Sequence, residues 1–355
     1  MATQNSGLTR RTALGLGSGG LALALSPSGL FAQEMTFFRI ATGGTAGTYY
    51  PVGALIANVI SNPPGSRDCD KGGSCGVPGL VAAAQSSDGS VANAKAVSEG
   101  LVESGFCQSD VVFWAYNGEG IFKGAEPRRD LRLIANLYPE VLQIVARHDS
   151  GIETVADMRG KRISLDVEGS GTLVDARIVL DSYDIKESEL EAVYVPHGTA
   201  VSMLRAGELD AFFLIAGYPT NSVFDLVQED LATLVPMADG EAISLMVDHP
   251  FFSLSVVPEG TYADLPLITT LAIGAQWIVT ADVDDDLIFG ITQALWNENS
   301  RALLDSGHPA ARQIKLENAL VGAAIPLHPG ARRYYEEAGL DLSHVPLPDD
   351  GSDLA

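Results

Sequence analysis

Residues 40–53, IATGGTAGTYYPVG, lead from an apolar run through glycines and threonines into a segment with helical spacing. Residues 37–42 have the apolar character of a buried strand, and one helical stripe follows the loop. The stripe consists of Val52, Leu55, Ile56, Val59 and Ile60. Strand, small polar loop and helix in this order form the repeating unit of α/β folds, which is the fold class we expect.

Three later stretches repeat this order of strand, loop and helix. They are SSDGSVAN at 86–93, EGSGT at 168–172 and AGYPT at 216–220. In open α/β sheets such loops lie at the carboxyl ends of the strands, where ligands bind. The helix N-termini there offer free N–H groups and partial positive charge, which suit a carboxylate. For each single loop, an ordinary Ser or Gly helix cap remains the alternative.

Phosphate is a poor match for these loops. No lysine occurs between Phe37 and Asn62, so the P-loop pattern is missing, and G-x-G-x-x-G fails across the glycines of 43–47. All four loops are also without arginine and lysine. The pattern therefore favours a carboxylate held by neutral donors.

Alternating strand-like and helix-period segments restart after residue 160, which predicts two α/β domains joined by extended connections. Further strands are expected at 111–115, 131–137, 141–147, 162–167, 193–196 and 210–216, and a helix at 284–304. Two connections between α/β domains form a hinge with a cleft. The predicted limits are 33–138 with 262–355 for domain 1, 145–250 for domain 2, and 139–144 with 251–261 for the crossing segments.

The N-terminus has the pattern of an export signal, with Arg10 and Arg11 before an apolar run and a small-residue exit near Ala32. The run is shorter than the roughly 20 residues of a membrane helix, and the paired arginines indicate twin-arginine export. We expect residues 1–32 to be cleaved and the protein to be periplasmic. A disordered basic N-terminus is the alternative.

The net charge of −23 is strongly acidic. Such a surface repels nucleic acid and anionic lipid, so neither is expected as a partner. An anionic ligand would gain nothing from the overall field and would depend on local donors.

Cysteine usage fits an oxidising compartment. Cys69 and Cys75 flank a Gly-rich turn and are predicted to form a disulfide, while Cys107 stands apart. Loop closure of so short a ring is expected to contribute roughly 2 kcal/mol. Zinc is the alternative, but no histidine lies near either cysteine. We expect no metal and no cofactor.

Enzyme signatures are missing: the sequence contains no H-E-x-x-H motif and no G-x-S-x-G nucleophile elbow, and no Cys–His cluster has ligand spacing. We therefore expect no enzyme activity. His197, between a strand and a helix, is either a ligand contact or a capping residue. Asp110 either caps a neighbouring loop or, with Gln108, contacts ligand. Tyrosines beside the loops form a cleft wall or belong to the core.

The ordered motifs together resemble the TAXI solute-binding proteins, the extracytoplasmic receptors of one class of tripartite ATP-independent periplasmic (TRAP) transporters. The matching segments are GTAGTYYPVG, SSDGSVAN, QSDVVFWAYNG, NLYPE, DMRGKRISLDVEGSGT, GELDAFFLIAGYPT, PEGTY and IPLHPGARRYYEEAG. They cover essentially all of the chain after the signal. The resemblance implies a type II periplasmic-binding-protein fold, with two α/β domains joined by two crossing strands and a ligand cleft between them.

The resemblance also implies a ligand site. With Ser86, Gly171 and His197 added from the loops, the predicted set is Thr42, Gly43, Gly44, Thr45, Tyr49, Tyr50, Ser86, Ser90, Asn93, Gln108, Tyr138, Glu140, Ser170, Gly171, Thr172, His197, Gly217, Tyr218, Pro219 and Thr220. Two residues depart from the family pattern. Asp88 would oppose a ligand carboxylate or pair with a ligand amine, and His197 stands where an acidic residue is expected.

By the same resemblance, the ligand is a small organic acid, with dicarboxylates such as glutamate or 2-oxoglutarate favoured. The partners are the TRAP membrane subunits, driven by an ion gradient, and we expect the receptor to be a monomer. A receptor of the same fold that presents its ligand to a membrane sensor kinase is the alternative.

Overall fold

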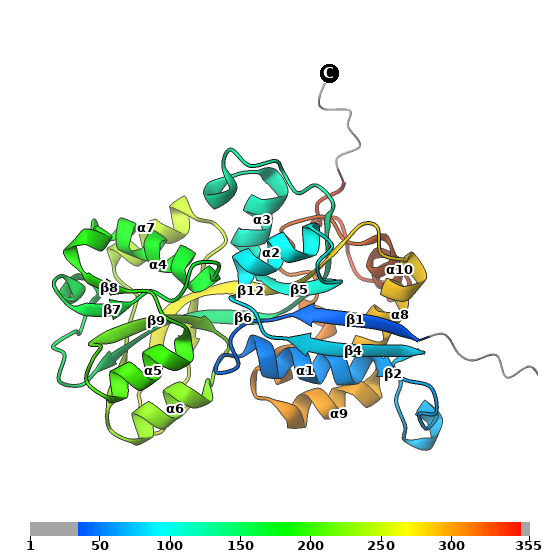
Figure 1. Ribbon diagram of the computed structural model, residues 1–355, viewed down its shortest axis with the longest axis horizontal. Coiled ribbons are helices and arrows are strands. Elements are labelled where there is room, and N and C mark those ends of the chain that lie inside the picture. The colour runs from blue at the N-terminus through cyan, green and yellow to red at the C-terminus, as the bar shows by residue number, and fades with distance from the viewer. Residues whose placement is uncertain (1–34, 349–355) are drawn as a thin grey trace, which may run out of the picture. The chain divides into compact units, whose positions relative to one another are not determined.

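The computed structural model describes residues 35–348, and the predicted export signal lies outside the described residues. A ten-stranded mixed sheet has the order β4-β1-β5-β12-β6-β9-β7-β8, with β10 paired to β6 and β11 to β12 (Figure 1). Its strands are β1 (Thr36–Ala41), β4 (Leu80–Gln85), β5 (Ser104–Gln108), β6 (Leu131–Arg147), β7 (Arg162–Ser164), β8 (Glu191–Val193), β9 (Ala211–Ala216), β10 (Ala232–Val235), β11 (Ser253–Val257) and β12 (Ile268–Thr280). A separate pair joins β2 (Ser61–Asn62) to β3 (Val77–Pro78).

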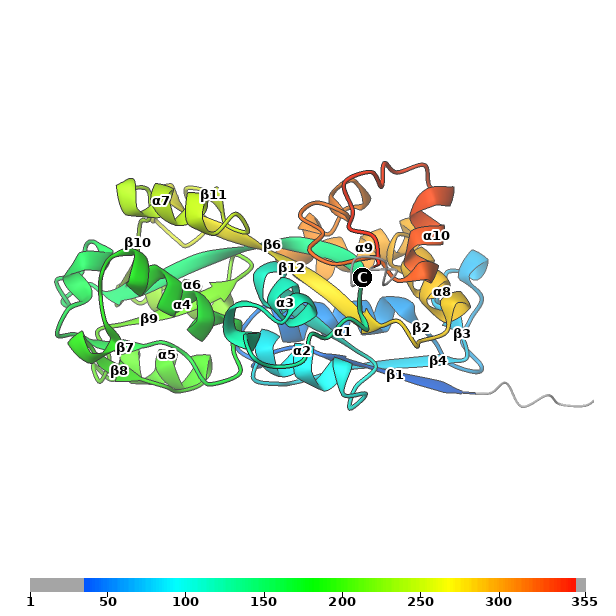
Figure 2. The same ribbon diagram turned by 90° about the horizontal axis from the view of Figure 1, so that it is seen from above.

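Two long strands, β6 and β12, run through the whole sheet. They pair antiparallel from Leu131 opposite Thr280 to Val141 opposite Ala272. Beyond that point, β6 continues beside β9, and β12 pairs with β11. Figure 2 shows both strands extending from one group of helices to the other. These strands therefore link two halves of the fold.

The first half contains the parallel strands β4, β1 and β5, and the second contains the parallel strands β7, β8 and β9. Helices cover both faces of the sheet in each half (Figure 1). Those of the first half are α1 (Tyr49–Ile60), α2 (Ser90–Ser98), α3 (Ser109–Asn117), α8 (Asp285–Leu295), α9 (Glu298–Gly307) and α10 (Pro329–Glu337). Those of the second half are α4 (Gly171–Ser182), α5 (His197–Arg205), α6 (Asn221–Gln228) and α7 (Gly240–Asp248). Within residues 35–348, no helix has the length and apolar character needed to cross a bilayer.

The buried side chains divide in the same way. One cluster fills the first half, around Trp277 and Phe106, and two clusters lie on opposite faces of the sheet in the second half. Strand β9 shows why two clusters form there. Because successive side chains on a strand point to opposite faces, Phe213 joins one cluster and Phe212 the other. All six residues of β9 are buried, as expected for a strand covered on both faces.

The strand predicted at 111–115 is wrong, because these residues lie in helix α3. The strand before it is β5, whose five residues are all buried. Val111, Val112 and Ala115 are buried at spacings that place them on one helical face. Gly118, in the left-handed conformation, ends the helix. Packing of this face therefore prevails over the strand propensity of valine and the aromatics.

The predicted helix at 284–304 is two helices, α8 and α9. Asn297 separates them, and its side chain accepts a hydrogen bond from the backbone N–H of Asn299 at the start of α9. The strands predicted at 131–137 and 141–147 are instead one continuous strand, β6. The domain limits inferred from the sequence stay a prediction.

The predicted disulfide between Cys69 and Cys75 is confirmed. It closes a turn that includes a short 3₁₀ helix, Cys69–Lys71, and Cys107 is a buried free thiol.

Replacing both Cys69 and Cys75 with serine is expected to lower the free energy of unfolding by roughly 2 kcal/mol, because the unfolded chain regains the entropy of a short loop. Urea denaturation of the oxidised protein measures the change. A reductant should destabilise the wild type by a similar amount and leave the double variant unaffected; a reductant effect on the variant would contradict this assignment.

Candidate functional site

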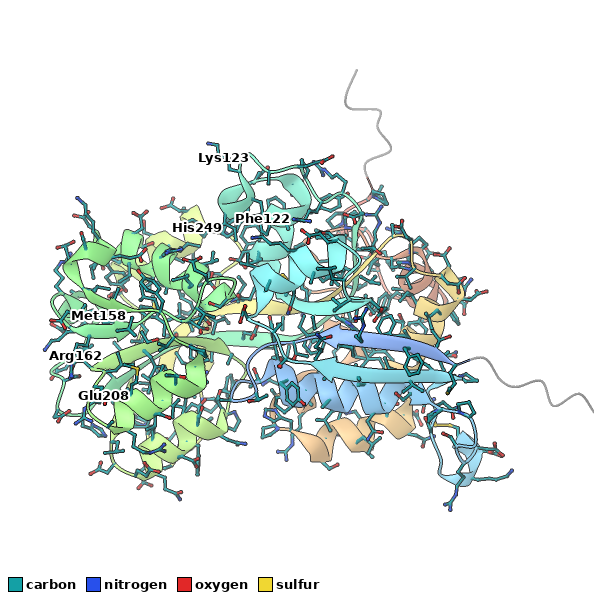
Figure 3. All side chains as sticks on the ribbon, in the orientation of Figure 1. Phe122, Lys123, Met158, Arg162, Glu208 and His249 are labelled. Atoms are coloured by element: carbon teal, nitrogen blue, oxygen red, sulfur yellow. A yellow bond between two sulfur atoms is a disulfide. The ribbon has the colours of Figure 1, made fainter. Side chains whose placement is uncertain are left out.

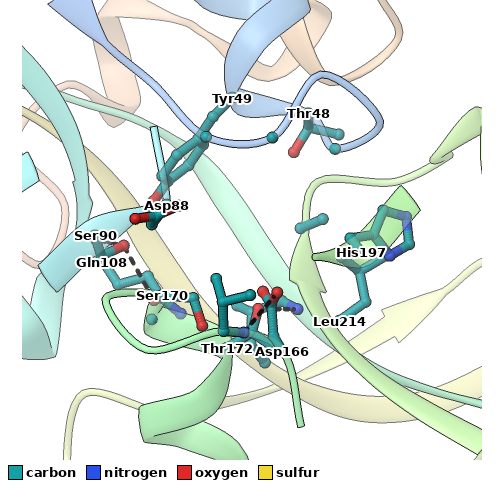
Figure 4. A pocket seen from close by; sticks show the side chains of 18 of the residues that line it. Thr48, Tyr49, Asp88, Ser90, Gln108, Asp166, Ser170, Thr172, His197 and Leu214 are labelled. Atoms are coloured by element: carbon teal, nitrogen blue, oxygen red, sulfur yellow. Dashed lines mark hydrogen bonds between the residues drawn. The ribbon is translucent and has the colours of Figure 1, made fainter. Parts of the chain in front are cut away.

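A cavity of about 100 Å³ lies where the carboxyl ends of the parallel strands of the two halves face each other. Figure 4 shows side chains from both halves surrounding it. Ten of the predicted residues line it: Gly43, Gly44, Tyr49, Ser90, Gln108, Glu140, Ser170, Gly171, Thr172 and His197. All four loops are adjacent to it, and the N-termini of α1, α2, α4 and α5 border it.

The other ten predicted residues do not line the cavity. They are Thr42, Thr45, Tyr50, Ser86, Asn93, Tyr138, Gly217, Tyr218, Pro219 and Thr220. Several of them support the lining loops. The Asn93 side chain donates to the carbonyls of Thr42 and Phe106, at 2.6 and 2.7 Å, and so joins the ends of β1 and β5. Thr220 donates through its hydroxyl to the carbonyl of Gly217.

Eleven lining residues were outside the predicted site: Gly47, Thr48, Ser87, Asp88, Gly89, Asp166, Val167, Pro196, Leu214, Ile215 and Ala216. Most lie next to a predicted residue in the same loop, so a signal existed at loop level. Leu214 and Ile215 had none, because an apolar strand end has the same sequence pattern whether it faces a cavity or a core.

Several hydrogen bonds join the two halves around the cavity. The backbone N–H of Gly217 donates to Oγ1 of Thr48 at 3.0 Å, and that of Ala92 donates to the carbonyl of Gly169, also at 3.0 Å. Gly89 is needed for close approach: its φ is +119°, and a Cβ there would lie 3.2 Å from Cα of Ser170. The structure is thus a closed form.

A network of buried polar groups lies behind the cavity. Nε2 of Gln108, in the first half, donates to Oδ2 of Asp175 in helix α4 at 2.6 Å. The Ser90 hydroxyl donates to Oε1 of the same glutamine at 3.1 Å. The Asp110 carboxyl lies close to that of Asp175, and burial raises the pKa of both carboxyls. Two neighbouring buried carboxyls do not both ionise readily, so this pair retains a proton more strongly than free aspartates do.

Glu140 occupies the crossing region of β6 and lines the cavity. It is 2% exposed, and the hydroxyl of Tyr49 donates to its Oε2 at 2.5 Å. Burial raises the pKa of Glu140 to about 8, although the hydrogen bond from Tyr49 lowers it. Asp166, on the loop after β7, is partly buried, and burial raises its pKa to about 6.

His197 begins helix α5 at the cavity edge. Its Nε2 is 2.8 Å from Oγ of Ser222, and its Nδ1 is buried without a partner. Burial lowers the pKa of His197 to about 4, so the ring is neutral at physiological pH. Among the described residues that line the cavity, all charged ones are acidic: Asp88, Glu140 and Asp166. Within residues 35–348, no three His, Cys, Asp or Glu side chains are grouped so as to hold a metal ion.

Over residues 40–339 the chain matches the model of the NMT1-like family. Because this match spans well over half of the chain, the protein belongs to the NMT1-like family.

Solved structures show a similar fold. A Bordetella bronchiseptica protein is 15% identical, with 90% of this chain and 86% of that one covered, and a TM-score of 0.51. MatC from Rhodopseudomonas palustris, solved with bound malate, is 13% identical, with 85% and 96% covered and a TM-score of 0.49. The alkanesulfonate-binding protein SsuA from Xanthomonas axonopodis pv. citri, bound to MOPS, is 18% identical, with 78% and 82% covered and a TM-score of 0.45. The predicted fold class is confirmed: two α/β halves are joined by two crossing strands, with a cavity between them, which is the architecture of a type II periplasmic binding protein.

Replacing Glu140 with glutamine is expected to make the free energy of unfolding less dependent on pH. The folded-state pKa of Glu140 is about 8, whereas in the unfolded chain a glutamate ionises near about pH 4. Between these values the unfolded state releases a proton that the folded state retains, so stability falls as pH rises, by up to about 1.4 kcal/mol per pH unit. Urea denaturation at about pH 5 and about pH 8 measures the difference.

The matched control is Glu208→Gln, because Glu208 is exposed at the outer edge of the second half (Figure 3). This control should follow the pH profile of the wild type. Identical pH profiles for Glu140→Gln and the wild type would contradict a protonated Glu140 in the folded protein.

Proposed function

We propose that this protein is an extracytoplasmic solute receptor of the TAXI type, which binds a small organic acid between its halves and delivers it to TRAP membrane subunits. The observation that carries the proposal is the closed cavity at the carboxyl ends of two sets of parallel strands. Ligands of open α/β sheets bind at this position. The N-terminal export pattern supports a periplasmic location, and the ordered family motifs favour a TRAP transporter.

The cavity suits a small ligand with a carboxylate. Four helix N-termini border it, and such termini stabilise negative charge through their N–H groups and dipoles. The hydroxyls of Ser90, Ser170 and Thr172 add neutral polar groups. At about 100 Å³ the cavity fits a metabolite of a few carbon atoms. Glutamate and 2-oxoglutarate both meet these conditions.

A ligand in a closed cleft is expected to stabilise the fold by mass action, by about 2.7 kcal/mol at a hundredfold excess over the dissociation constant. A thermal-shift screen of the purified protein against amino acids, dicarboxylates, sugars and divalent metals measures this effect. At least one carboxylate should raise the melting temperature. A rise with sugars or metals only would exclude the proposal.

Replacing Gly171 with alanine is expected to weaken binding of the ligand found in that screen at least about tenfold, a loss of about 1.4 kcal/mol. A Cβ on Gly171 would lie 1.2 Å from Oε1 of Gln108 across the interface between the halves, so the closed form cannot persist unchanged. Isothermal titration calorimetry measures the dissociation constant.

The matched control is Gly198→Ala in the first turn of α5, where a Cβ would lie at an ordinary 3.6 Å from Ala46. Its affinity should equal that of the wild type. Equal affinity in Gly171→Ala as well, with the fold intact by circular dichroism, would show that closure of this cavity is not part of binding.

A further inference from the structure

The charged wall of the cavity comes from three separate elements. Asp88 lies on the loop between β4 and α2, Glu140 on the crossing strand β6, and Asp166 on the loop between β7 and α4. Figure 4 shows Asp88 and Asp166 reaching the cavity from opposite halves. Carboxyls that converge from three elements are a feature of the tertiary structure rather than of one acidic segment.

The carboxyl of Glu140 is the group that most directly points to an interaction with the ligand. Its carboxyl is 2% exposed and lines the cavity, and Tyr49 is the partner that the structure gives to one of its two oxygens. Among residues 35–348, no hydrogen bond is formed with the other oxygen. A buried carboxyl that lacks full hydrogen bonding is costly for a fold. A ligand cation would favour the ionised form of Glu140 and could donate a hydrogen bond to this oxygen.

Asp166 and Asp88 add a second, independent observation. Asp166 has a φ of +73°, a left-handed conformation that is uncommon for residues other than glycine. Its Oδ1 accepts the N–H of Val167 at 2.9 Å, so the strained backbone fixes the carboxyl at the cavity. The negative charge of Asp88 opposes ionisation of Asp166 across the interface. Two like charges that face each other from opposite halves resist closure until a positive group lies between them.

We propose that the ligand carries an ammonium group, which binds among the carboxyls of Asp88, Glu140 and Asp166. This inference rests on the proposed function and narrows the ligand from small organic acids to amino acids. The ammonium has three N–H donors, and each of the three carboxyls offers an acceptor oxygen once Glu140 has lost its proton to solvent as the ammonium binds. The ligand carboxylate then lies toward the helix N-termini, with Ser90 and Thr172 beside it. Aspartates at 88 and 166 determine specificity, because they distinguish an amine from a ketone or hydroxyl.

Matched pairs of ligands test the proposal. Glutamate and 2-oxoglutarate share one carbon skeleton and differ in amine against ketone, and alanine and lactate differ in amine against hydroxyl. In titration calorimetry the amine member of a pair should bind roughly thirtyfold tighter or more, the range for a desolvated charge pair. Putrescine and calcium chloride are included in the panel as cations that carry no carboxylate.

Asp166→Asn keeps the shape of the side chain, and asparagine tolerates a left-handed backbone. It should weaken glutamate binding at least about tenfold and bring the glutamate and 2-oxoglutarate affinities closer together. Glu140→Gln should act in the same direction. The matched control is Asp184→Asn, because Asp184 also has a left-handed φ, of +52°, but is exposed outside the cavity. Its affinities should equal those of the wild type.

The outcomes separate the two proposals. If 2-oxoglutarate or lactate binds as tightly as its amine partner, the ammonium assignment is wrong while the organic-acid receptor stands. If only calcium or putrescine binds, the acidic wall serves a cation without a carboxylate, and the amino acid assignment fails. If no member of the panel binds, both proposals fail. If the wild type prefers the amine member of each pair and Asp166→Asn leaves this preference unchanged, the ammonium binds elsewhere, and its assignment to Asp166 is wrong.

Discussion

The antiparallel pairing of β6 and β12 is the constraint on which the rest of the structure depends. Each strand is long enough to belong to the sheet of both halves, and each pairs with different strands in the two halves. The parallel strands on either side are therefore aligned so that their carboxyl ends face each other. This alignment produces the cavity, because the loops and helix N-termini at those ends converge between the two halves.

Glu140 shows how the pairing of β6 and β12 determines which groups line the cavity. It lies on β6 opposite Ile273 of β12, at the point where the strands cross between the halves. Its backbone is fixed by the ladder, and Tyr49 at the start of α1 holds one of its oxygens. Nearby, the Asp110 carboxyl of α3 lies close to the Asp175 carboxyl of α4, and burial raises the pKa of both. Closure thus brings buried acids together, which is unfavourable unless protons or a ligand cation offset their charge.

The fold could be predicted from the sequence because strand, loop and helix are local patterns, and the four loops could be predicted for the same reason. The prediction failed where tertiary packing determines the local structure. Residues 111–115 have strand propensity but bury a helical face in α3. Within a loop, the direction of each side chain depends on backbone angles that the residue type does not reveal. Thr48 therefore faces the cavity while the predicted Thr45 is exposed, and Asp166 reaches the cavity through a left-handed backbone.

The acidity of the cavity wall also bears on how binding and closure are coupled. A receptor with a net charge of −23 repels a dianion at long range, whereas a zwitterion experiences little net repulsion. If the ligand carries an ammonium, as proposed, that group would neutralise the facing carboxyls and so favour the closed form. An acid without an amine would leave these carboxyls unpaired and would favour closure less. An arginine in the wall would hold a carboxylate more tightly, but it would also neutralise the wall itself and allow the empty cleft to close.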